Sequence, residues 1–467
     1  MAEQIKIILP EAVKKIINVL QSAGYEAWAV GGCVRDSILH REPDDWDITT
    51  SARPEQVKVL FHRTVDTGIQ HGTVTVLMDR VGYEVTTYRI DGEYEDARHP
   101  KEVQFTSDLL EDLKRRDFTI NALAISLNQE NYGVLIDPFG GLQHLEERLI
   151  KTPLEPGLTF SDDPLRMMRA IRFASQLNFQ IEENTFQAIA EYRHRLPIVS
   201  MERIMDEFNK IMLSPEPSRG IRLLDEAGLL EIFFPELTAL KGVDRVQGVK
   251  HKDNFYHTLT VLDTLSLYSQ DLWLRWAALL HDIGKPATKK YIQGQGWTFY
   301  GHNHVGERLV GKIFNRLKLP QNEKMKYVQK LVNLHMRPIV LSEETVTDSA
   351  VRRLLFDAGD DIDDLMTLAE ADITSKNEEK VKRFLENFKT VRRKLKEVEE
   401  KDSIRNFQPP ISGEEIIATF HLPPCKTIGD IKNAIKEAIL DGIIGNNYEE
   451  AREYMFKVAK ELGIDSQ

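Results

Sequence analysis

Two glycines and two aspartates near the N-terminus constrain this chain more than any other feature. Gly31 and Gly32 follow a short apolar run, and Asp45 and Asp47 come after a segment that favours a helix. Adjacent glycines let the backbone approach a phosphate closely, and Arg35 lies within the same turn to hold the negative charge. On a strand, residues two positions apart point to the same side, so the two aspartates should present their carboxylates to one point. Hard oxygen ligands beside a phosphate-holding loop suit Mg²⁺ and a nucleoside triphosphate.

The composition indicates a globular protein of several domains. The 467 residues predict two to four domains, and 42% hydrophobic with 29% charged residues is ordinary for a folded protein. Only Cys33 and Cys425 are present, which argues against a disulfide framework and fits a reducing cytosol. The first residues lack the features of a signal peptide, and no apolar run approaches the ~20 residues of a membrane span. We therefore expect a cytoplasmic protein without a membrane partner.

The net charge restricts how the chain binds nucleic acid. Phosphate contacts come from Lys and Arg, so a protein that covers RNA everywhere would be basic. This chain carries a formal charge of −12 at pH 7. Any RNA binding must therefore be confined to local patches, separated from the acidic remainder.

The hydrophobic pattern changes along the chain from mixed to helical. Residues 11–24 predict a helix that ends at Gly24, and segments near 25–30, 45–49, 73–78 and 83–90 predict strands, with a turn at 79–82. A small mixed sheet with helices is expected for residues 1–150. Beyond about residue 160 the apolar period is helical to the end, and the charged run at 380–401 predicts a solvated helix face, with an RNA-contacting helix as the alternative.

Five ordered motifs carry a resemblance to a known family. The chain resembles class II tRNA nucleotidyltransferases, the CCA-adding enzyme and poly(A) polymerase family of the DNA polymerase β-like superfamily. Motif A is Gly31 to Asp36 with Asp45 to Asp47, motif B is 115–122, motif C is 137–141, motif D is 162–166 and motif E is 200–208. A sixth block at 281–286 resembles an HD domain. Motif D departs from the family in having Asp162 where Glu is usual.

The resemblance assigns roles in the predicted head. Asp45 and Asp47 are the expected metal ligands, and superfamily members usually add a third carboxylate, for which Glu84 is the candidate; an exposed strand Glu is the alternative. The resemblance further implies a nucleotide-binding set. In it, Gly31, Gly32 and Arg35 hold the triphosphate, Arg116 lies near the triphosphate or ribose, Asp117 helps to recognise the ribose, and Asn121 fixes motif B. Arg115 could equally be a surface charge.

Motif D is expected to select the base. Members of the family read the incoming base with protein side chains, and Asp offers acceptors where Arg offers a rigid donor fork. Asp163 and Arg166 are three residues apart, so on a helix they share a face and can brace one another. The bases C and A each present an exocyclic amino group, which donates, beside a ring nitrogen, which accepts. U and G present a carbonyl oxygen in place of the amino group, so the same pair of side chains should reject them. Arg169 and Arg172 should reach phosphate or base; a surface ion-pair ladder is the alternative.

Two further segments extend the resemblance. Residues 91–100 match the family's flexible loop, which is associated with the switch from C to A addition, and an ordinary surface loop is the alternative. His257, His281, Asp282 and Asp372 match the metal ligand set of HD phosphohydrolases, for which Mn²⁺, Ni²⁺ or another divalent transition metal is suitable. His302, His304 and His335 are candidates for a second metal or for phosphate binding, and a purely structural HD unit remains an alternative.

The combined prediction is an α+β protein with a polymerase β-like nucleotidyltransferase head and a mixed sheet, followed by an all-α neck, an HD-containing body and a tail. The expected ranges are 1–150 for the head, 151–225 for the neck, 226–375 for the body and 376–467 for a tail that docks tRNA. The expected activity is template-independent addition of C, C and A to the tRNA 3′ end from CTP and ATP, with a second hydrolytic activity at the HD site. A poly(A) polymerase or A-adding specialist, or an HD phosphohydrolase with an RNA-binding head, are the alternatives. The sequence indicates no oligomeric state.

Overall fold

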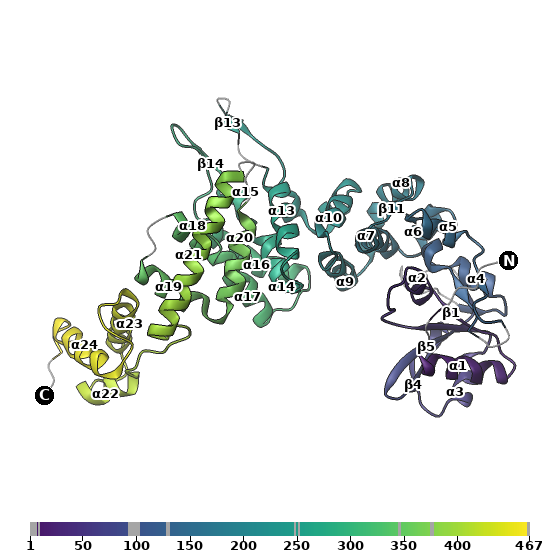
Figure 1. Ribbon diagram of the computed structural model, residues 1–467, viewed down its shortest axis with the longest axis horizontal. Helices are drawn as coiled ribbons and strands as arrows, with labels where there is room; N and C mark the ends of the chain where they lie inside the picture. The colour runs from purple at the N-terminus through teal and green to yellow at the C-terminus, as the bar shows by residue number, and fades with distance from the viewer. Residues whose placement is uncertain are drawn as a thin grey trace. The chain divides into compact units, whose positions relative to one another are not determined.

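The computed structural model forms two compact units, which meet in sequence at Pro235 and Glu236 (Figure 1). It describes residues 7, 10–91, 103–127, 131–246, 249–250, 253–343, 347–373 and 378–464. Helices predominate over strands in the element order. None of the helices in these described ranges combines the length and the apolar character that crossing a bilayer requires.

A mixed sheet of seven strands lies at the centre of the first unit, in the order β3-β4-β5-β2-β1-β8-β9. β2 and β5 are parallel, and the other neighbouring pairs are antiparallel. Their register places Asp47 opposite Glu84. The strands are β1 (Ala27–Val30), β2 (Asp47–Thr50), β3 (Thr64–Gly68), β4 (Thr73–Met78), β5 (Val81–Thr87), β8 (Ala124–Ile125) and β9 (Leu135–Ile136).

Short helices connect these strands. α1 (Glu11–Ser22) buries Val13, Ile16, Ile17 and Leu20, which is the apolar face that its sequence predicts. The other elements of this part are α2 (Gly32–Ile38), α3 (Pro54–Leu60), η1 (Ile69–His71), the pair β6 (Arg89–Asp91) and β7 (Val103–Phe105), α4 (Leu109–Lys114), η2 (Thr119–Asn121) and α5 (Gly141–Glu146).

The rest of the first unit is helical, apart from one pair of short parallel strands. β10 (Leu149–Ile150) pairs with β11 (Gln180–Ile181) and so ties the sheet-containing part to the helices that follow. α7 buries most of its apolar residues and ends at Asn178, which adopts a left-handed φ of 58°. The helices are α6 (Pro156–Asp162), α7 (Leu165–Leu177), α8 (Glu183–Tyr192), η3 (Arg193–Ile198), α9 (Met201–Met212), α10 (Pro217–Glu226) and α11 (Leu230–Phe233).

The second unit is a helical body with two small hairpins. Its apolar helix α14 carries the fully buried Arg275, which donates to the carbonyl oxygen of Ser266, the last residue of α13, and to that of Ser269 in the connection that follows. The helices are α12 (Pro235–Thr238), α13 (Asn254–Ser266), α14 (Leu272–Leu280), α15 (Lys285–Thr288), α16 (His302–Arg316), α17 (Glu323–Leu334), α18 (Met336–Glu343), α19 (Asp348–Ala358), η4 (Gly359–Asp361), α20 (Ile362–Asp372), α21 (Glu378–Asp402), α22 (Gly413–Phe420), α23 (Lys426–Asp441) and α24 (Tyr448–Glu461). The hairpins are β12 (Arg245–Val246) with β13 (Val249–Lys250), and β14 (Lys290–Ile292) with β15 (Gly296–Thr298).

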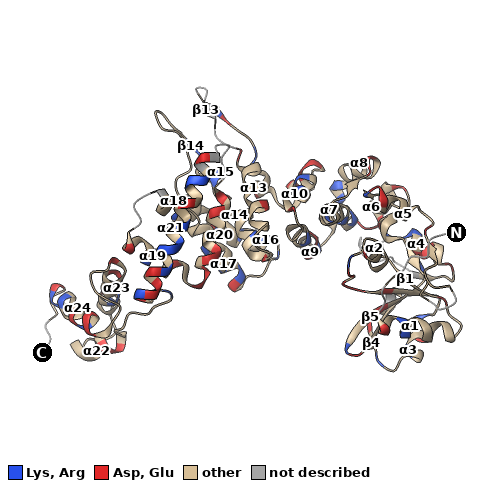
Figure 2. Cartoon of the chain, viewed as in Figure 1, with Lys and Arg blue, Asp and Glu red and all other residues tan. Residues whose placement is uncertain are grey.

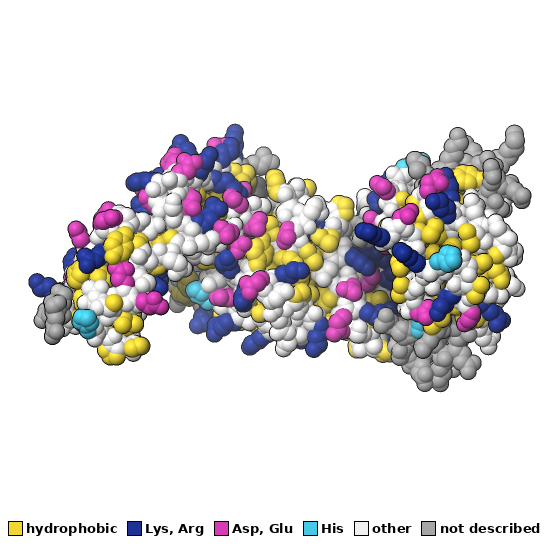
Figure 3. All heavy atoms as spheres, turned by 90° about the horizontal axis from the view of Figure 1, so that it is seen from below, with side chains coloured by type: hydrophobic (Ala, Val, Ile, Leu, Met, Phe, Trp, Pro, Cys, Tyr) yellow, Lys and Arg dark blue, Asp and Glu magenta, His cyan; other side chains and the backbone are white. Residues whose placement is uncertain are grey.

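Charged side chains of both signs are interspersed over the helices. Figure 2 shows both signs along α21, the helix that the charged run at 380–401 predicted. The face in Figure 3 also mixes basic and acidic side chains across its surface. Ion pairs along α21, such as that of Arg392 with Glu370 at 2.7 Å, account for part of this pattern.

The architecture confirms the predicted α+β class and corrects it in detail. β2 begins at Asp47, so Asp45 precedes the strand instead of lying on it, and Glu84 lies inside β5 instead of opening it. The turn between β4 and β5 is made by Asp79 and Arg80, both at positive φ, as a tight hairpin of twisted strands requires. The region expected to be all-α contains the short strand β11, because an extended segment after α7 pairs with β10.

Candidate active site and candidate metal centre

Three carboxylates lie near one another at the start of β2, an interior strand of the sheet. Asp47 opens β2, Glu84 is its partner on β5, and Asp45 lies two residues before the strand. Burial and the charge of Asp45 raise the pKa of Asp47, while Arg116 lowers it. Burial and the charges of Asp47 and Asp45 likewise raise the pKa of Glu84. Carboxylates that destabilise one another's ionised form are a donor set that fits a divalent cation.

Gly31 brings an arginine against this carboxylate cluster. Its φ is +82°, and a Cβ there would lie 3.0 Å from the Arg116 guanidinium and 3.9 Å from a carboxylate oxygen of Asp47. Only a glycine leaves room for this close approach. The Gly31 amide itself donates to the carbonyl oxygen of Leu123 at 3.0 Å, so it is engaged within the fold. A phosphate-holding role for Gly31 stays a prediction, and Arg116 is the cation beside Asp47.

Arg116 is held by a residue that the sequence analysis did not single out. Asp112 on α4 is fully buried and pairs with Arg115 at 2.9 Å and with Arg116 at 3.5 Å. Thr49 on β2 also donates to Asp112 at 3.2 Å. Burial raises the pKa of Asp112, but the two arginines outweigh it and leave the pKa below its ordinary value. Arg115 is thus an internal partner of Asp112, and its spacing of three residues was the available signal.

Arg35 joins motif A to motif B. Its guanidinium donates to both carboxylate oxygens of Asp36, at 2.8 and 2.9 Å, and to the side-chain oxygen of Asn121 at 2.7 Å. The residue is 8% exposed. These contacts make Arg35 a link between the two motifs, and its role in holding triphosphate stays a prediction.

Asp117 and Asn121 form the centre of motif B. One oxygen of Asp117 accepts from the Phe118 amide and from Asn121, and the other accepts from Arg169 at 2.8 Å. Burial raises the pKa of Asp117, but Arg169 and Asn121 outweigh it and hold the pKa well below the ordinary value. Asn121 therefore contacts both Arg35 and Asp117, which supports its predicted role of fixing motif B.

The two motif D residues that are expected to select the base, Asp163 and Arg166, have separate partners. Asp163 is extended and precedes α7, and it accepts from the Leu165 amide at 3.0 Å and from Arg203 of motif E at 3.1 Å. Arg166 lies on α7 and donates to the carbonyl oxygen of Arg115 at 2.8 Å. The expected mutual bracing of Asp163 and Arg166 is thus replaced by these two contacts, because Asp163 lies outside the helix.

Glu207 of motif E lies close to the other two arginines of α7, Arg169 and Arg172. It is 4% exposed and lies 2.6 Å from Arg172 and 4.0 Å from Arg169. Burial lowers the pKa of Arg172 to about 10, although Glu207 opposes the shift. Arg169 and Arg172 are therefore paired with Asp117 and Glu207 inside the unit and do not form an exposed ion-pair ladder. Glu207 lies within motif E (200–208), for which no site residue was predicted.

Motif C packs against motif B through the start of α5. Asp137 accepts from the backbone amides of Gly141 and Leu142 at the start of α5, at 2.6 and 2.9 Å. A Cβ on Gly141 would overlap the carbonyl oxygen of Thr119 in η2. Thr119 also contacts His144 of α5 at 2.9 Å. Motif C therefore fixes η2, the turn that carries Asn121.

The second unit brings the HD residues together from separate helices. His257 lies on α13, His281 and Asp282 directly follow α14, and Asp372 ends α20. The His257 Nε2 atom lies 2.9 Å from Asp372, and the His281 Nε2 atom lies 3.3 Å from Asp282 and 3.5 Å from Asp372. All four predicted ligands thus form one cluster.

A second group adjoins the first through Asp282. Its other carboxylate oxygen lies 3.4 Å from His302 and 3.9 Å from His335. Asp282, His302 and His335 are all buried, whereas His304 is exposed and lies outside both clusters of metal-ligand geometry. The extra candidates His302 and His335 therefore join the site.

The imidazoles are oriented as metal ligands. Carbonyl oxygens only accept hydrogen bonds, so the Nδ1 atoms that face them donate, and the Nε2 atoms point into the cluster. The three pairs are His281 with Ala278 at 2.7 Å, His302 with Phe299 at 2.9 Å and His335 with Val332 at 2.6 Å.

The charges of the cluster also favour a cation. Burial lowers the pKa of His281, but Asp282 and Asp372 outweigh it and raise the pKa to about 10. Among the described residues, none meets the buried His281 Nε2 atom with full hydrogen-bond geometry, although two carboxylates lie near it, and the Nε2 atoms of His302 and His335 face each other at 3.3 Å. Burial lowers the pKa of His335 to about 4, which keeps this imidazole neutral near pH 7. Converging nitrogen and carboxylate donors of this kind fit a divalent metal.

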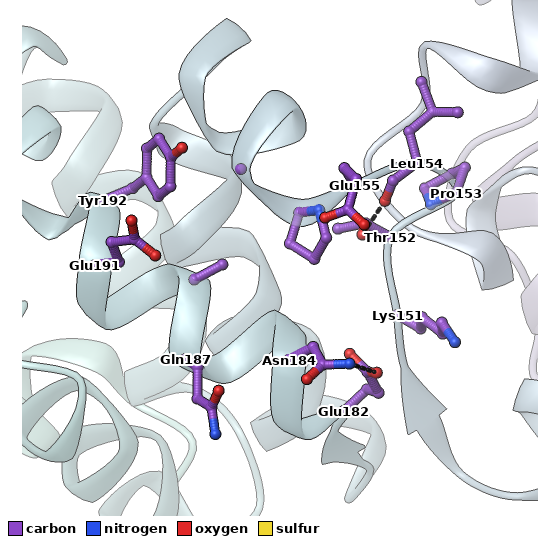
Figure 4. Close-up of a pocket in the computed structure, with 13 residues that line it drawn as sticks. Lys151, Thr152, Pro153, Leu154, Glu155, Glu182, Asn184, Gln187, Glu191 and Tyr192 are labelled. Carbon is purple, nitrogen blue, oxygen red and sulfur yellow. Dashed lines mark hydrogen bonds between the residues drawn. The ribbon is translucent and has the colours of Figure 1, made fainter.

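A separate pocket of about 610 Å³ lies in the first unit, between the segment 151–157 and α8 (Figure 4). Thr152 donates to the Leu154 carbonyl and Asn184 donates to Glu182, so some polar groups are engaged within its wall. None of the predicted site residues lines it. Residues 92–100, most of the predicted switching loop, lie outside the described part of the chain.

Comparison with known proteins matches three consecutive regions of the chain. They are the Poly A polymerase head domain over residues 27–151, the probable RNA and SrmB-binding site of polymerase A over 178–241, and the HD domain over 254–377. The carboxylate cluster thus lies in the first region and the histidine cluster in the third. The chain thus carries, in this order, a region similar to the head domain of poly(A) polymerases, a region similar to their probable RNA-binding site, and an HD domain.

This chain has several curated relatives that share one name. It is 45% identical to a CCA-adding enzyme of Anoxybacillus flavithermus over 57% of this chain and 63% of that one, and 50% identical to one of Geobacillus sp. over 48% and 54%. The matches thus span between about half and two thirds of these curated relatives. The structure resembles the crystal structure of the Bacillus stearothermophilus CCA-adding enzyme in complex with CTP, with a TM-score of 0.69, 28% identity, and coverage of 98% of this chain and 99% of the other.

Proposed function

We propose that this nucleotidyltransferase adds C, C and A to the 3′ end of tRNA, without a nucleic-acid template, from CTP and ATP. The observation that carries the proposal is the cluster of Asp45, Asp47 and Glu84 beside Arg116 and Gly31. The naming of its curated relatives as CCA-adding enzymes, and the CTP in the related Bacillus stearothermophilus structure, support the same reaction.

The carboxylates and Arg116 divide the chemistry of the transfer. Asp45, Asp47 and Glu84 would hold divalent cations, for which Mg²⁺ is proposed, and bound metal would supply charge neutralisation at the attacking and leaving oxygens. Arg116 lies beside Asp47 and is restrained by Asp112, so it is preorganised to bind the triphosphate. The Gly32 amide, at the start of α2, is the backbone donor proposed to join it.

Base selection is proposed for Asp163 and Arg166. Arg203 restrains Asp163 and the Arg115 carbonyl restrains Arg166, so each side chain is fixed before a base arrives. An acceptor and a donor fork match the amino and ring-nitrogen edge of C and A. Asp117 is proposed to serve the ribose, with Arg169 holding its carboxylate in place.

The histidine cluster is proposed to be a second, hydrolytic site. His257, His281, Asp282 and Asp372 would hold Mn²⁺, Ni²⁺ or another divalent transition metal, and bound metal would polarise a phosphate ester. We propose hydrolysis of a phosphomonoester or a 2′,3′-cyclic phosphate. Loss of this hydrolysis in His281→Ala, with nucleotide addition retained, is the expected result; a protein that binds no metal there would be evidence for a structural HD unit.

The proposed division of labour follows the chain. A head (1–150) catalyses addition, a neck (151–225) selects the base, a body (226–375) carries the HD site, and a helical tail (376–467) docks tRNA. We also propose a cytoplasmic location, in keeping with the free thiols of Cys33 and Cys425.

The direct test is to incubate the purified protein with tRNA that lacks its last three residues. Each nucleotide is supplied alone and CTP and ATP are supplied together. We expect two C additions with CTP alone and completion to CCA with both. Addition of A only, once or in a long run, would instead favour an A-adding specialist or a poly(A) polymerase.

A further inference from the structure

Phe173 is surrounded by three guanidinium groups. It lies in the middle of α7 and is 4% exposed, so the sequence pattern alone marks it as a core residue. The guanidinium carbons of Arg172, Arg35 and Arg169 lie 4.1, 4.9 and 5.4 Å from the centre of its ring. All three distances fall within the range of a cation–π contact. We call these three arginines and Phe173 the arginine cluster.

The arginine cluster joins α7 to three motifs. Arg35 comes from motif A and contacts Asn121 of motif B, and Arg169 contacts Asp117 of motif B. Arg172 contacts Glu207 of motif E. Phe118, which follows Asp117, also packs edge-on against Phe173, with ring centres 5.9 Å apart at 82°.

Three cations around one site repel one another unless something offsets their charge. The carboxylates of Asp36, Asp117 and Glu207 do so from outside the cluster. The negative faces of the Phe173 ring are the remaining source of attraction at its centre, and such attraction strengthens when the partners are buried. An aliphatic side chain of similar size would fill the space without this attraction.

We propose that Phe173 is a positioning residue for nucleotide addition, whose ring holds the three arginines so that motifs B and D present Asp117 and Arg166 in fixed positions to the incoming nucleotide. This inference rests on the proposed function and deepens it. It makes selection between nucleotides depend on a side chain that need not contact any of them.

The experiment compares three variants. Phe173→Leu removes the aromatic ring, and Phe173→Tyr keeps it. Phe160→Leu is the matched control, because Phe160 is fully buried in the preceding helix α6 and, among the described residues, makes no cation–π contact. For each protein, kcat and KM are measured with CTP, ATP and UTP on tRNA lacking its last three residues, together with the thermal unfolding midpoint.

We expect Phe173→Leu to lower kcat/KM for CTP at least about tenfold, equal to about 1.4 kcal/mol, and to raise the relative use of UTP. Phe173→Tyr should keep both the kcat/KM for CTP and the discrimination against UTP close to those of wild type. Phe160→Leu should lower the thermal unfolding midpoint about as much as Phe173→Leu does, without changing the ratio of CTP to UTP use. An unchanged ratio in Phe173→Leu, or an equal change in Phe160→Leu, would overturn the positioning role.

A second measurement needs no nucleotide. Modification by phenylglyoxal, mapped by mass spectrometry, reports whether guanidinium groups are shielded. Arg35 and Arg172 should be shielded in wild type, Phe173→Tyr and Phe160→Leu, and reactive in Phe173→Leu; equal shielding in all four proteins would contradict the cluster. If wild type adds no nucleotide while this pattern holds, the proposed function is wrong and the arrangement of the arginines stands.

Discussion

At the scale of single residues, the charged side chains of this site contact one another more than the sequence indicates. Arg35 was expected to face a phosphate, yet it binds Asp36 and Asn121. The motif identified Arg35 as a candidate site residue. It did not identify the residues that Arg35 contacts, because one of them, Asn121, is distant in the sequence. The partners of Asp112 also depend on the fold. The sequence alone does not distinguish a buried aspartate that pairs with arginines from an exposed one.

Asp112→Asn tests whether Arg116 is held from within. The change leaves two arginines facing a neutral side chain, so the free energy of unfolding should fall by about 3 kcal/mol, as expected when one partner of a buried ion pair is removed. Nucleotide addition should fall as well, because Arg116 loses its restraint beside Asp47. Chemical denaturation and CTP incorporation measure the two effects.

Glu111→Gln is the control on the same helix. Glu111 pairs with Lys114 and is partly exposed, so its loss should cost less than about 1 kcal/mol and leave incorporation unchanged. Equal effects of the two changes would show that Asp112 has no special role.

At the scale of elements, helices and strands with strong periodicity were predicted well, and contacts between elements were not. The sequence predicted α1, α7, β4 and β5 because their apolar residues recur with a clear period. It missed β11 and both hairpins of the second unit, whose strands of two or three residues are too short for a pattern. It also placed Asp163 on a helix, whereas that residue lies just before α7 and binds Arg203 from α9.

Gly141→Ala tests how motif C supports motif B. The added methyl group would overlap the Thr119 carbonyl oxygen, a backbone atom that cannot turn aside. We expect η2 to shift, the protein to lose at least about 2 kcal/mol of stability, and nucleotide addition to fall. Thermal unfolding and CTP incorporation provide the measurement.

The matched control is Gly429→Ala in α23, where a Cβ would meet nothing within 4 Å. Alanine favours a helix over glycine by up to about 1 kcal/mol, so this change should be neutral or stabilising. If Gly141→Ala were equally harmless, the close packing of α5 on η2 would be refuted.

At the scale of the whole molecule, two compact units each carry one candidate site. The carboxylate cluster lies in the unit that ends at Pro235, and the histidine cluster lies in the unit that begins at Glu236. The sequence identified both sets of candidate ligands, because ligand types and motif order are local information. The proximity of Asp282 to His302 and His335 could be seen only in the folded structure, since these residues lie at the ends of three separate helices.

This separation predicts that a transition metal stabilises only one unit. A metal present at a hundred times its dissociation constant adds about 2.7 kcal/mol to the state that binds it. Calorimetry of chelator-treated protein should show that Mn²⁺ or Ni²⁺ raises the unfolding transition of the histidine-containing unit. Asp47→Ala should retain this shift and His281→Ala should lose it; a shift that survives in His281→Ala would place the metal elsewhere.

The central claim is that the carboxylates of the first unit carry out nucleotide addition, and the most direct measurement is CTP and ATP incorporation by Asp45→Ala and Asp47→Ala. Both variants keep the second unit intact, so its metal-dependent stabilisation serves as the internal control for folding. We predict that each variant folds, retains that stabilisation and adds no nucleotide above background. Near-normal incorporation by either variant would contradict the assignment of the catalytic site.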